Sequence, residues 1–312
     1  MSALVVAEAG VNHNGDTGMA RRLVDAAFDA GADAVKFQTF KAETLVTKTA
    51  EKANYQKTLT KKGESQFEMI KKLELDRDTH EDLILHCEKK GISFLSTAFD
   101  HASIELLDKL NLPFFKIPSG EITNLSYIAR IARKGQPMIV STGMSYLSEV
   151  EAAIRTIHES GSPEFVLLHC VSNYPANPAD VNLKAMGTMA MVFDAPVGYS
   201  DHTLGIEVPI AAAALGACVI EKHFTLCRAD GGVDSAFSLE PAEMKPLVIE
   251  TERASSSLGR IFYGPTEAEK GSLAGRRSLY IVEDMNKGEV LNEQNLREPE
   301  KRFSVPFVNY AG

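Results

Sequence analysis

The 312-residue sequence lacks the signatures of several protein classes. Its four cysteines, Cys87, Cys170, Cys218 and Cys227, form no Cys-x-x-Cys pair, which argues against a zinc ribbon or a redox dithiol. There is no run of five or more basic residues and the formal net charge is −9, so nucleic acid is not an expected partner. No stretch approaches the roughly 18 apolar residues of a membrane helix, and the N-terminus has no signal-peptide pattern. We therefore expect a cytoplasmic protein without a membrane partner, in which Cys170 and Cys218 pack in the core.

Short apolar runs, each followed by a helix-like stretch, recur along the first 220 residues. They lie at residues 4–7, 34–37, 92–95, 114–117, 138–140, 165–168, 196–198 and 218–220. Such continuous runs fit strands that are buried on both faces, and their alternation with helices indicates a parallel sheet with right-handed crossovers. Eight units predict a closed TIM (β/α)8 barrel. An open doubly wound sheet is the rival, but no Gly-x-Gly-x-x-Gly follows the first strand.

Apolar periodicity and capping residues predict several of the helices. We expect helices at 19–30 and 78–90, a helix capped by Asn124, another capped by Ser148, and a last one over 240–258. Between the second and third strands, residues 41–62 are expected to cross the barrel mouth, followed by a short helix at 66–72.

A change of composition after the last helix predicts a division of the chain. Residues 1–258 form the predicted catalytic barrel, 259–276 a linker rich in Gly, Pro, Thr and charge, and 277–312 a small separate segment. The segment is expected to contain a strand at 278–282 and a turn at 286–289. About 36 residues are too few for an independent core, so it must lean on another surface.

Polar side chains follow the predicted strands at the end where ligands of parallel α/β folds bind. Lys36 and Lys116 lie within apolar strands, where each is costly unless it is paired with negative charge. Together with the nearby hydroxyls of Thr97, Ser119, Ser141 and Ser200, they indicate a bound phosphate or carboxylate.

Two histidines end adjacent strands of the predicted barrel. His202 and His223 can point at one spot, and two imidazoles with open positions suit a divalent transition metal. A general acid–base role is the alternative. Glu8 and Glu121 also lie at the predicted mouth, where they could transfer protons or neutralise the two lysines.

The strand-end motifs resemble those of the sialic acid synthase family, which includes the N-acetylneuraminate and legionaminate synthases and their pseudaminate relatives. They lie at residues 7–15, 36–39, 116–121, 141–144, 168–170 and 174–175, with Gly-Tyr-Ser-Asp-His-Thr at 198–203 and Glu-Lys-His-Phe-Thr at 221–225. The resemblance implies a TIM barrel joined to an antifreeze-like domain in a domain-swapped homodimer. Residues 277–312 then correspond to a short, incomplete antifreeze-like segment. Arg297 and Arg302 are candidates for the arginine that this domain lends to the partner's sugar site.

The resemblance also assigns roles to individual residues. The implied catalytic residues are Glu8, Glu121 and His223, and the implied ligands of Mn²⁺ or Mg²⁺ are His202 and His223. The residues implied to bind phosphoenolpyruvate are Lys36, Thr97, Lys116, Ser119, Ser141, Ser172 and Ser200, and those implied to bind the sugar are Gln38, Glu121, Tyr174 and Asp234. Some members of the family have Asn where this chain has Ser172.

The implied reaction condenses phosphoenolpyruvate with N-acetylmannosamine or a close analogue and with water, and it gives a nine-carbon 2-keto sugar acid and phosphate. An alternative is legionaminate synthesis from 2,4-diacetamido-2,4,6-trideoxymannose. More distant alternatives are an aldolase with a Schiff base on Lys36 or Lys116 and a sugar-binding relative without catalysis.

Overall fold

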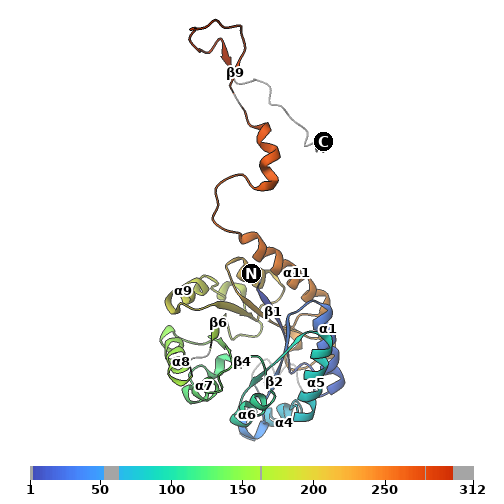
Figure 1. The fold of residues 1–312 in the computed structure, drawn as a ribbon. Helices are drawn as coiled ribbons and strands as arrows, with labels where there is room; N and C mark the ends of the chain where they lie inside the picture. Colours follow the sequence, from blue (N-terminus) through green and yellow to red (C-terminus); the bar gives the residue numbers. More distant parts are fainter. Residues whose placement is uncertain (1–2, 53–62, 162–163, 278, 298–312) are drawn as a thin grey trace. The chain divides into compact units, whose positions relative to one another are not determined.

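The computed structural model describes residues 3–52, 63–161, 164–277 and 279–297 (Figure 1). By compactness the chain divides into two units, Met1–Gly259 and Arg260–Gly312. No helix in the described part of the chain is long and apolar enough to cross a membrane.

The first unit is a closed parallel barrel, as the alternating pattern predicts (Figure 1). Its strands are β1 (Leu4–Gly10), β2 (Ala34–Thr39), β3 (Ser93–Ala98), β4 (Phe115–Ile117), β5 (Met138–Ser141), β6 (Phe165–Cys170), β7 (Val197–Asp201) and β8 (Val219–His223). They pair in chain order, and β8 closes the barrel on β1. The last two strands extend beyond the predicted apolar runs, so Ser200 and His223 lie within strands.

Helices surround the barrel (Figure 1). They are α1 (Thr17–Asp29), α2 (Ala42–Leu45), α4 (Gln66–Lys71), α5 (Arg77–Lys90), α6 (His101–Lys109), α7 (Leu125–Ala132), α8 (Leu147–Ser160), α9 (Lys184–Phe193), α10 (Glu207–Ala214) and α11 (Pro241–Leu258). The predicted Asn124 cap is confirmed, because its Oδ1 accepts the Tyr127 N–H at 3.2 Å. The predicted Ser148 cap is wrong: α8 begins at Leu147, and Glu149 accepts the Tyr146 N–H at 2.7 Å.

Two layers of side chains fill the barrel interior. The lower layer is apolar and is built from Val6, Ala34, Leu95, Ile139, Leu168 and Val219. A mostly polar layer lies two residues nearer the carboxyl end of each strand, on the same face of the pleat. One residue from each strand forms it: Glu8, Lys36, Thr97, Lys116, Ser141, Cys170, Ser200 and Glu221. The apolar layer therefore closes the barrel beneath a polar floor.

The second unit contains a 3₁₀ segment, η5 (Glu267–Gly275), and a short antiparallel pair, β9 (Tyr280–Ile281) with β10 (Leu296–Arg297). The turn predicted at 286–289 is confirmed by a 3.1 Å hydrogen bond from the Glu289 N–H to the Asn286 carbonyl. Three earlier expectations fall partly or wholly outside the described residues: residues 53–62 of the excursion predicted at 41–62, Ser278 of the strand predicted at 278–282, and Arg302.

Candidate active site

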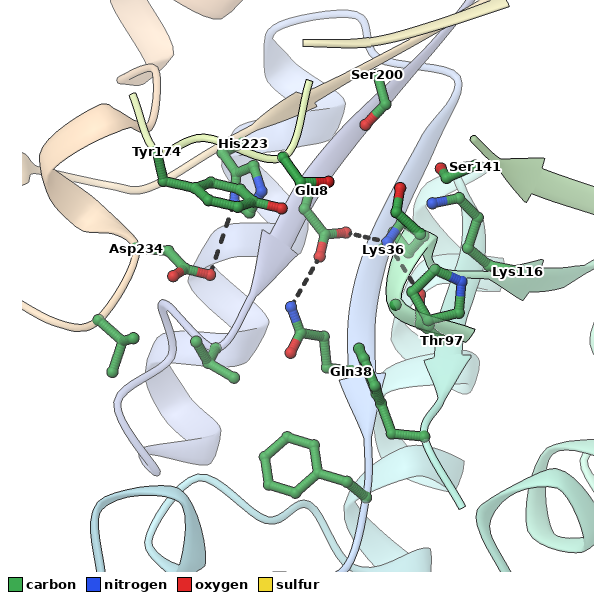
Figure 2. A pocket seen from close by; sticks show the side chains of 18 of the residues that line it. Glu8, Lys36, Gln38, Thr97, Lys116, Ser141, Tyr174, Ser200, His223 and Asp234 are labelled. Atoms are coloured by element: carbon green, nitrogen blue, oxygen red, sulfur yellow. Dashed lines mark hydrogen bonds and ion pairs between the residues drawn. The ribbon is translucent and has the colours of Figure 1, made fainter. Parts of the chain in front are cut away.

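A cavity of about 380 Å³ opens at the carboxyl ends of the strands, and the polar layer forms its floor. Figure 2 shows Lys116, Ser141 and Ser200 toward one side and Tyr174, His223 and Asp234 toward the other, with Glu8, Lys36 and Gln38 between them. The cavity therefore has a side rich in hydroxyls with a lysine and a side that holds the histidine and the aspartate.

The floor is held together by buried ion pairs. Lys36 Nζ lies 2.6 Å from Glu8 Oε2 and 3.6 Å from Glu221 Oε2, and Lys116 Nζ lies 3.1 Å from Glu221 Oε1. Lys36 also donates to Thr97 Oγ1 at 3.0 Å, and Ser200 Oγ donates to Glu221 Oε1 at 2.9 Å. The expectation that these lysines need buried counter-charges is thus confirmed.

The ionisation of the floor follows from burial and charge together. Burial raises the pKa of Glu8 more than Lys36 lowers it. Burial likewise lowers the pKa of Lys116 although Glu221 opposes this effect. Burial acts in the same direction on Lys36, but Glu221 and Glu8 outweigh it and raise the Lys36 pKa. The pKa of Glu221 is depressed because Lys116 and Lys36 overcome its burial. A firmly ionised Glu221 therefore sits between the two lysines.

Glu221 is the site residue that sequence reasoning missed. Glu8 and Glu121 were the carboxylates expected to neutralise the two lysines, but Glu121 lies in the 3₁₀ turn after β4, where its Oε2 accepts from Asn124 Nδ2 at 2.8 Å. It does not line the cavity. Glu221 is two residues before His223 in β8, so strand alternation places both side chains on the inner face. This two-residue spacing from His223 could have identified Glu221 as a cavity residue.

A polar corner lies at the ends of β4, β5 and β6, where the Gly143 N–H donates to Ser119 Oγ at 3.0 Å. Ser141 Oγ and Ser172 Oγ are buried without a hydrogen-bond partner among the described residues. A Cβ added at Gly143 would stand 2.4 Å from Ser172 Oγ and 2.8 Å from Ser119 Oγ, so only glycine fits beside them. Buried donors without partners are costly, and an anion would satisfy them. Cys170 also lines this corner, contrary to the expectation that it merely fills core.

His202 and His223 converge, as predicted. Their ring centroids are 5.5 Å apart, and the Tyr174 ring lies 4.2 Å from that of His202. His202 Nδ1–H donates to the Val171 carbonyl at 2.7 Å, which leaves Nε2 with its lone pair free to bind a ligand. Burial lowers the pKa of both rings, so both are neutral and able to coordinate a cation.

The protein supplies only some of the ligands that a divalent cation would need at this position. His223 Nδ1 is buried without a hydrogen-bond partner, although Asp234 Oδ2 lies 3.7 Å from it. Among the described residues, no group of three or more His, Cys, Asp or Glu side chains is arranged to hold a metal. The two imidazoles therefore suit a cation whose remaining ligands are oxygens of water or substrate.

Asp234 and Gln38 complete the side of the cavity that holds the histidines. Burial, reinforced by the charge of Glu8, raises the pKa of Asp234 to about 7. Gln38 Nε2 donates to Glu8 Oε1 at 3.3 Å. Of all the residues predicted for the site, only Glu121 does not line the cavity in the described structure.

Another buried ion pair, separate from those of the floor, lies on the outer face of β7 and β8. Lys222 Nζ binds Asp201 Oδ2 and the Thr203 carbonyl, and the Tyr199 hydroxyl donates to Asp201 Oδ1 at 2.9 Å. Because these residues alternate along the strands with Ser200, Glu221 and His223, the pair fastens the strand ends that carry the cavity residues.

Comparisons with known proteins identify the family of this chain. A family model described as the NeuB family matches residues 23–263. N,N'-diacetyllegionaminic acid synthase of Campylobacter jejuni is 48% identical, with 98% of this chain and 93% of the relative covered. The enzyme of the same name from Legionella pneumophila is 50% identical, with 95% and 85% covered. A solved structure of an N-acetylneuraminic acid synthetase from Leptospira borgpetersenii, in complex with citrate, superposes with a TM-score of 0.78 at 35% identity, covering 88% of this chain and 91% of that chain.

Proposed function

Since the chain belongs to the NeuB family, we propose that it is a phosphoenolpyruvate-dependent synthase of a nine-carbon 2-keto sugar acid. The co-substrates are an N-acyl hexosamine, such as N-acetylmannosamine or a close analogue, and water. The observation that carries this proposal is the cavity floor, where two buried lysines and a set of hydroxyls lie beside a convergent pair of histidines.

Phosphoenolpyruvate is assigned to the polar corner. Ser141 and Ser172 offer buried hydroxyl donors that have no partner in the described part of the chain, and Lys116 offers an ammonium in the same cavity. Charge-assisted hydrogen bonds of this kind are the strong ones in proteins. Ser119, Ser200, Thr97 and Lys36 complete the proposed contacts with the phosphate and carboxylate groups.

The proposed reaction forms a carbon–carbon bond and then breaks the C2–O bond of phosphoenolpyruvate. The C3 carbon of phosphoenolpyruvate attacks the aldehyde carbon of the open-chain sugar, and the aldehyde oxygen takes up a proton. Carbon–carbon bond formation leaves C2 cationic, and water adds there and gives up one proton. When the C2–O bond to phosphate breaks, the C2 hydroxyl becomes the keto group and passes its proton to the departing phosphate. Glu8 is the proposed proton-transfer group, because burial raises its pKa and its Oε2 has no hydrogen-bond partner among the described residues other than its ion pair with Lys36. The sequence also assigned Glu121 to proton transfer and sugar contact, and that role remains a proposal.

The sugar is assigned to the other side of the cavity. Gln38, Tyr174 and Asp234 would bind its hydroxyl and amide groups, since all three line the cavity there. His202 and His223 are proposed to hold Mn²⁺ or Mg²⁺, and a bound cation would supply Lewis-acid polarisation of the aldehyde oxygen.

The proposal is tested by phosphate release from phosphoenolpyruvate in the presence of N-acetylmannosamine or 2,4-diacetamido-2,4,6-trideoxymannose. We expect release that is lost on chelation and restored by Mn²⁺. His202→Ala and His223→Ala should each abolish it while thermal unfolding stays cooperative. Full activity of either variant in chelator would overturn the metal assignment. Borohydride trapping of a pyruvate adduct on Lys36 or Lys116 would instead favour an aldolase. Sugar binding without phosphate release would favour a non-catalytic sugar-binding protein.

Three further properties are proposed with the synthase function. Residues 277–312 are assigned to an antifreeze-like segment, which the antiparallel β9–β10 pair supports. A homodimer is supported by Met144, Tyr146 and Leu147, which leave apolar surface exposed between β5 and α8. The molar mass from light scattering tests the dimer, and cell fractionation tests the expected cytoplasmic location.

A further inference from the structure

The loop that follows β8 carries one of the proposed sugar contacts. Its inner stretch, residues 231–238, places Asp234 in the wall of the cavity, where Figure 2 shows it on the same side as Tyr174 and His223. Phe237 in this stretch packs against both of these rings, with centroid distances of 5.3 Å to Tyr174 and 5.0 Å to His223. The position of the stretch therefore shapes the side of the cavity that is assigned to the sugar.

A buried asparagine from a distant part of the sequence holds this stretch. Asn12 lies in the turn after β1 and has none of its surface exposed. Its Nδ2 donates to the Phe224 carbonyl and to Ser238 Oγ, at 2.9 Å in each case. Ser238 Oγ donates in turn to the Asp234 carbonyl at 2.6 Å. The Asn12 amide therefore joins the two ends of the loop 224–238 and is connected through one serine to the backbone of Asp234.

Both contacts of Asn12 require it to donate. Ser238 has a single hydroxyl hydrogen, which the Asp234 carbonyl accepts, so the serine oxygen accepts from Asn12. The Phe224 carbonyl oxygen has no hydrogen to give. Asn12 Oδ1 has no hydrogen-bond partner among the described residues, so donation by Nδ2 is the contribution of this amide. Aspartate has nearly the same shape but at most one hydrogen to donate, and a buried acceptor left without a donor costs free energy.

The carboxylate of Asp234 stands in a crowded place, where a shift of the loop would be felt. Gly10, two residues before Asn12, has a φ of 52°. A Cβ added there would lie 3.1 Å from Glu8 Oε1 and 3.2 Å from Gln38 Nε2. It would also lie 3.6 Å from Asp234 Oδ2. Three polar groups of the cavity therefore converge over one glycine, and the turn that follows this glycine supplies the amide that holds the third group.

Resting on the proposed function, we propose that Asn12 is a positioning residue for sugar binding. Asn12 is not among the residues that line the cavity in the described structure, so it acts on the sugar by fixing the backbone of Asp234 and the stretch that carries Phe237. The polar corner assigned to phosphoenolpyruvate belongs to β4, β5 and β6, whereas the hydrogen bonds of Asn12 link the ends of β1 and β8. Loss of the Asn12 amide should therefore weaken the binding of the sugar and not that of phosphoenolpyruvate.

Two variants and a matched control test this role by steady-state kinetics of phosphate release. Asn12→Asp and Ser238→Ala should each raise the KM for the sugar, by about 10- to 100-fold for Asn12→Asp, and leave the KM for phosphoenolpyruvate within about twofold. Because both variants break the same link, the double variant should exceed Asn12→Asp by no more than about twofold. Asn14→Asp makes the same chemical change where the amide donates to the Gly231 carbonyl at 3.2 Å on the surface. Water can replace that bond, so both KM values should stay within about twofold of wild type.

The outcomes separate the positioning role from the proposed function. Equal rises in both KM values, or an unchanged KM for the sugar, overturn the role of Asn12, and Ser238→Ala carries the test if Asn12→Asp does not fold. Absence of phosphate release from the wild type with every sugar overturns the proposed function instead.

Hydrogen exchange measured by mass spectrometry then still tests the role of Asn12. The amides of residues 233–238 should exchange about tenfold faster in Asn12→Asp than in wild type, and those of β5 and β6 at the same rate. Unchanged exchange at 233–238, or an equal increase throughout the barrel, would show that Asn12 does not position this stretch.

Discussion

Replacing Glu221 with glutamine tests the charge arrangement of the cavity floor. Among the described residues, Glu221 is the carboxylate within ion-pair distance of Lys116, at 3.1 Å, and it also accepts from Ser200. Glutamine keeps the shape but leaves Lys116 as a buried ammonium without a counter-charge. Removing one partner of a buried ion pair costs about 3–5 kcal/mol, so we expect a loss of that size in the free energy of unfolding at neutral pH.

The loss should depend on pH and on anions. Burial already lowers the pKa of Lys116, and loss of Glu221 lowers it further, below the value in the unfolded chain. A lysine with a depressed pKa in the folded state destabilises the fold fully at pH values below that pKa, and the penalty shrinks as pH rises from there toward the ordinary lysine pKa of 10.5. The difference in unfolding free energy between Glu221→Gln and wild type should therefore narrow as pH rises from neutral toward 10.5. Inorganic phosphate, which can replace the missing negative charge, should stabilise the variant more than the wild type.

Chemical denaturation monitored by circular dichroism measures both effects. The matched control is Glu81→Gln, which removes an exposed carboxylate 2.7 Å from Arg77 and should cost about 0.5 kcal/mol or less. A loss for Glu221→Gln below about 1 kcal/mol, or one as small as that of the control, would refute the argument that this carboxylate neutralises the floor.

Two other buried groups give predictions of the same kind. Because Asp234 keeps its proton up to about pH 7 in the folded protein, against an ordinary pKa of 3.8, it should make wild-type stability fall by about 2–3 kcal/mol as pH rises from 5 to 8. Asp234→Asn should remove that fall in metal-free protein, and parallel pH curves for the two proteins would contradict the assignment. Lys222→Met leaves the buried carboxylate of Asp201 without its counter-charge and should lower the free energy of unfolding, measured by urea denaturation, by about 3–5 kcal/mol. A decrease under about 1 kcal/mol would show that the fold does not need this ion pair.

The barrel could be predicted because its local signals agree. Apolar runs and intervening helices follow one another in regular order, and the Asn124 cap confirms the start of α7. The cap of α8 could not be read in this way, since Ser148 is a good capping type but Glu149 reaches back to the Tyr146 N–H instead. Sequence shows which residues are able to cap a helix, whereas the geometry of the turn decides which one does so.

The apolar residues that line one side of the cavity had no comparable signal. Leu45 and Met69 lie in short helices between β2 and β3, where too few residues are present to establish a periodic face. Leu73 follows α4, and Val233 follows β8 at a distance in sequence. Their shared cluster exists only because the barrel brings these segments to one side of its mouth. The sequence therefore predicted most of the polar floor but not the apolar lining of the cavity.

The floor contains one ion pair that the sequence can predict and one that it cannot. Glu8 and Lys36 are partners in the register of adjacent strands, so alternation and strand order suffice to bring them together. Lys116 and Glu221 come from β4 and β8, which stand opposite each other in the eight-stranded barrel. No local rule pairs residues 105 positions apart. Their contact depends on the width of the closed barrel and on the length of a lysine side chain, and for this reason sequence reasoning offered Glu8 and Glu121 as counter-charges and not Glu221.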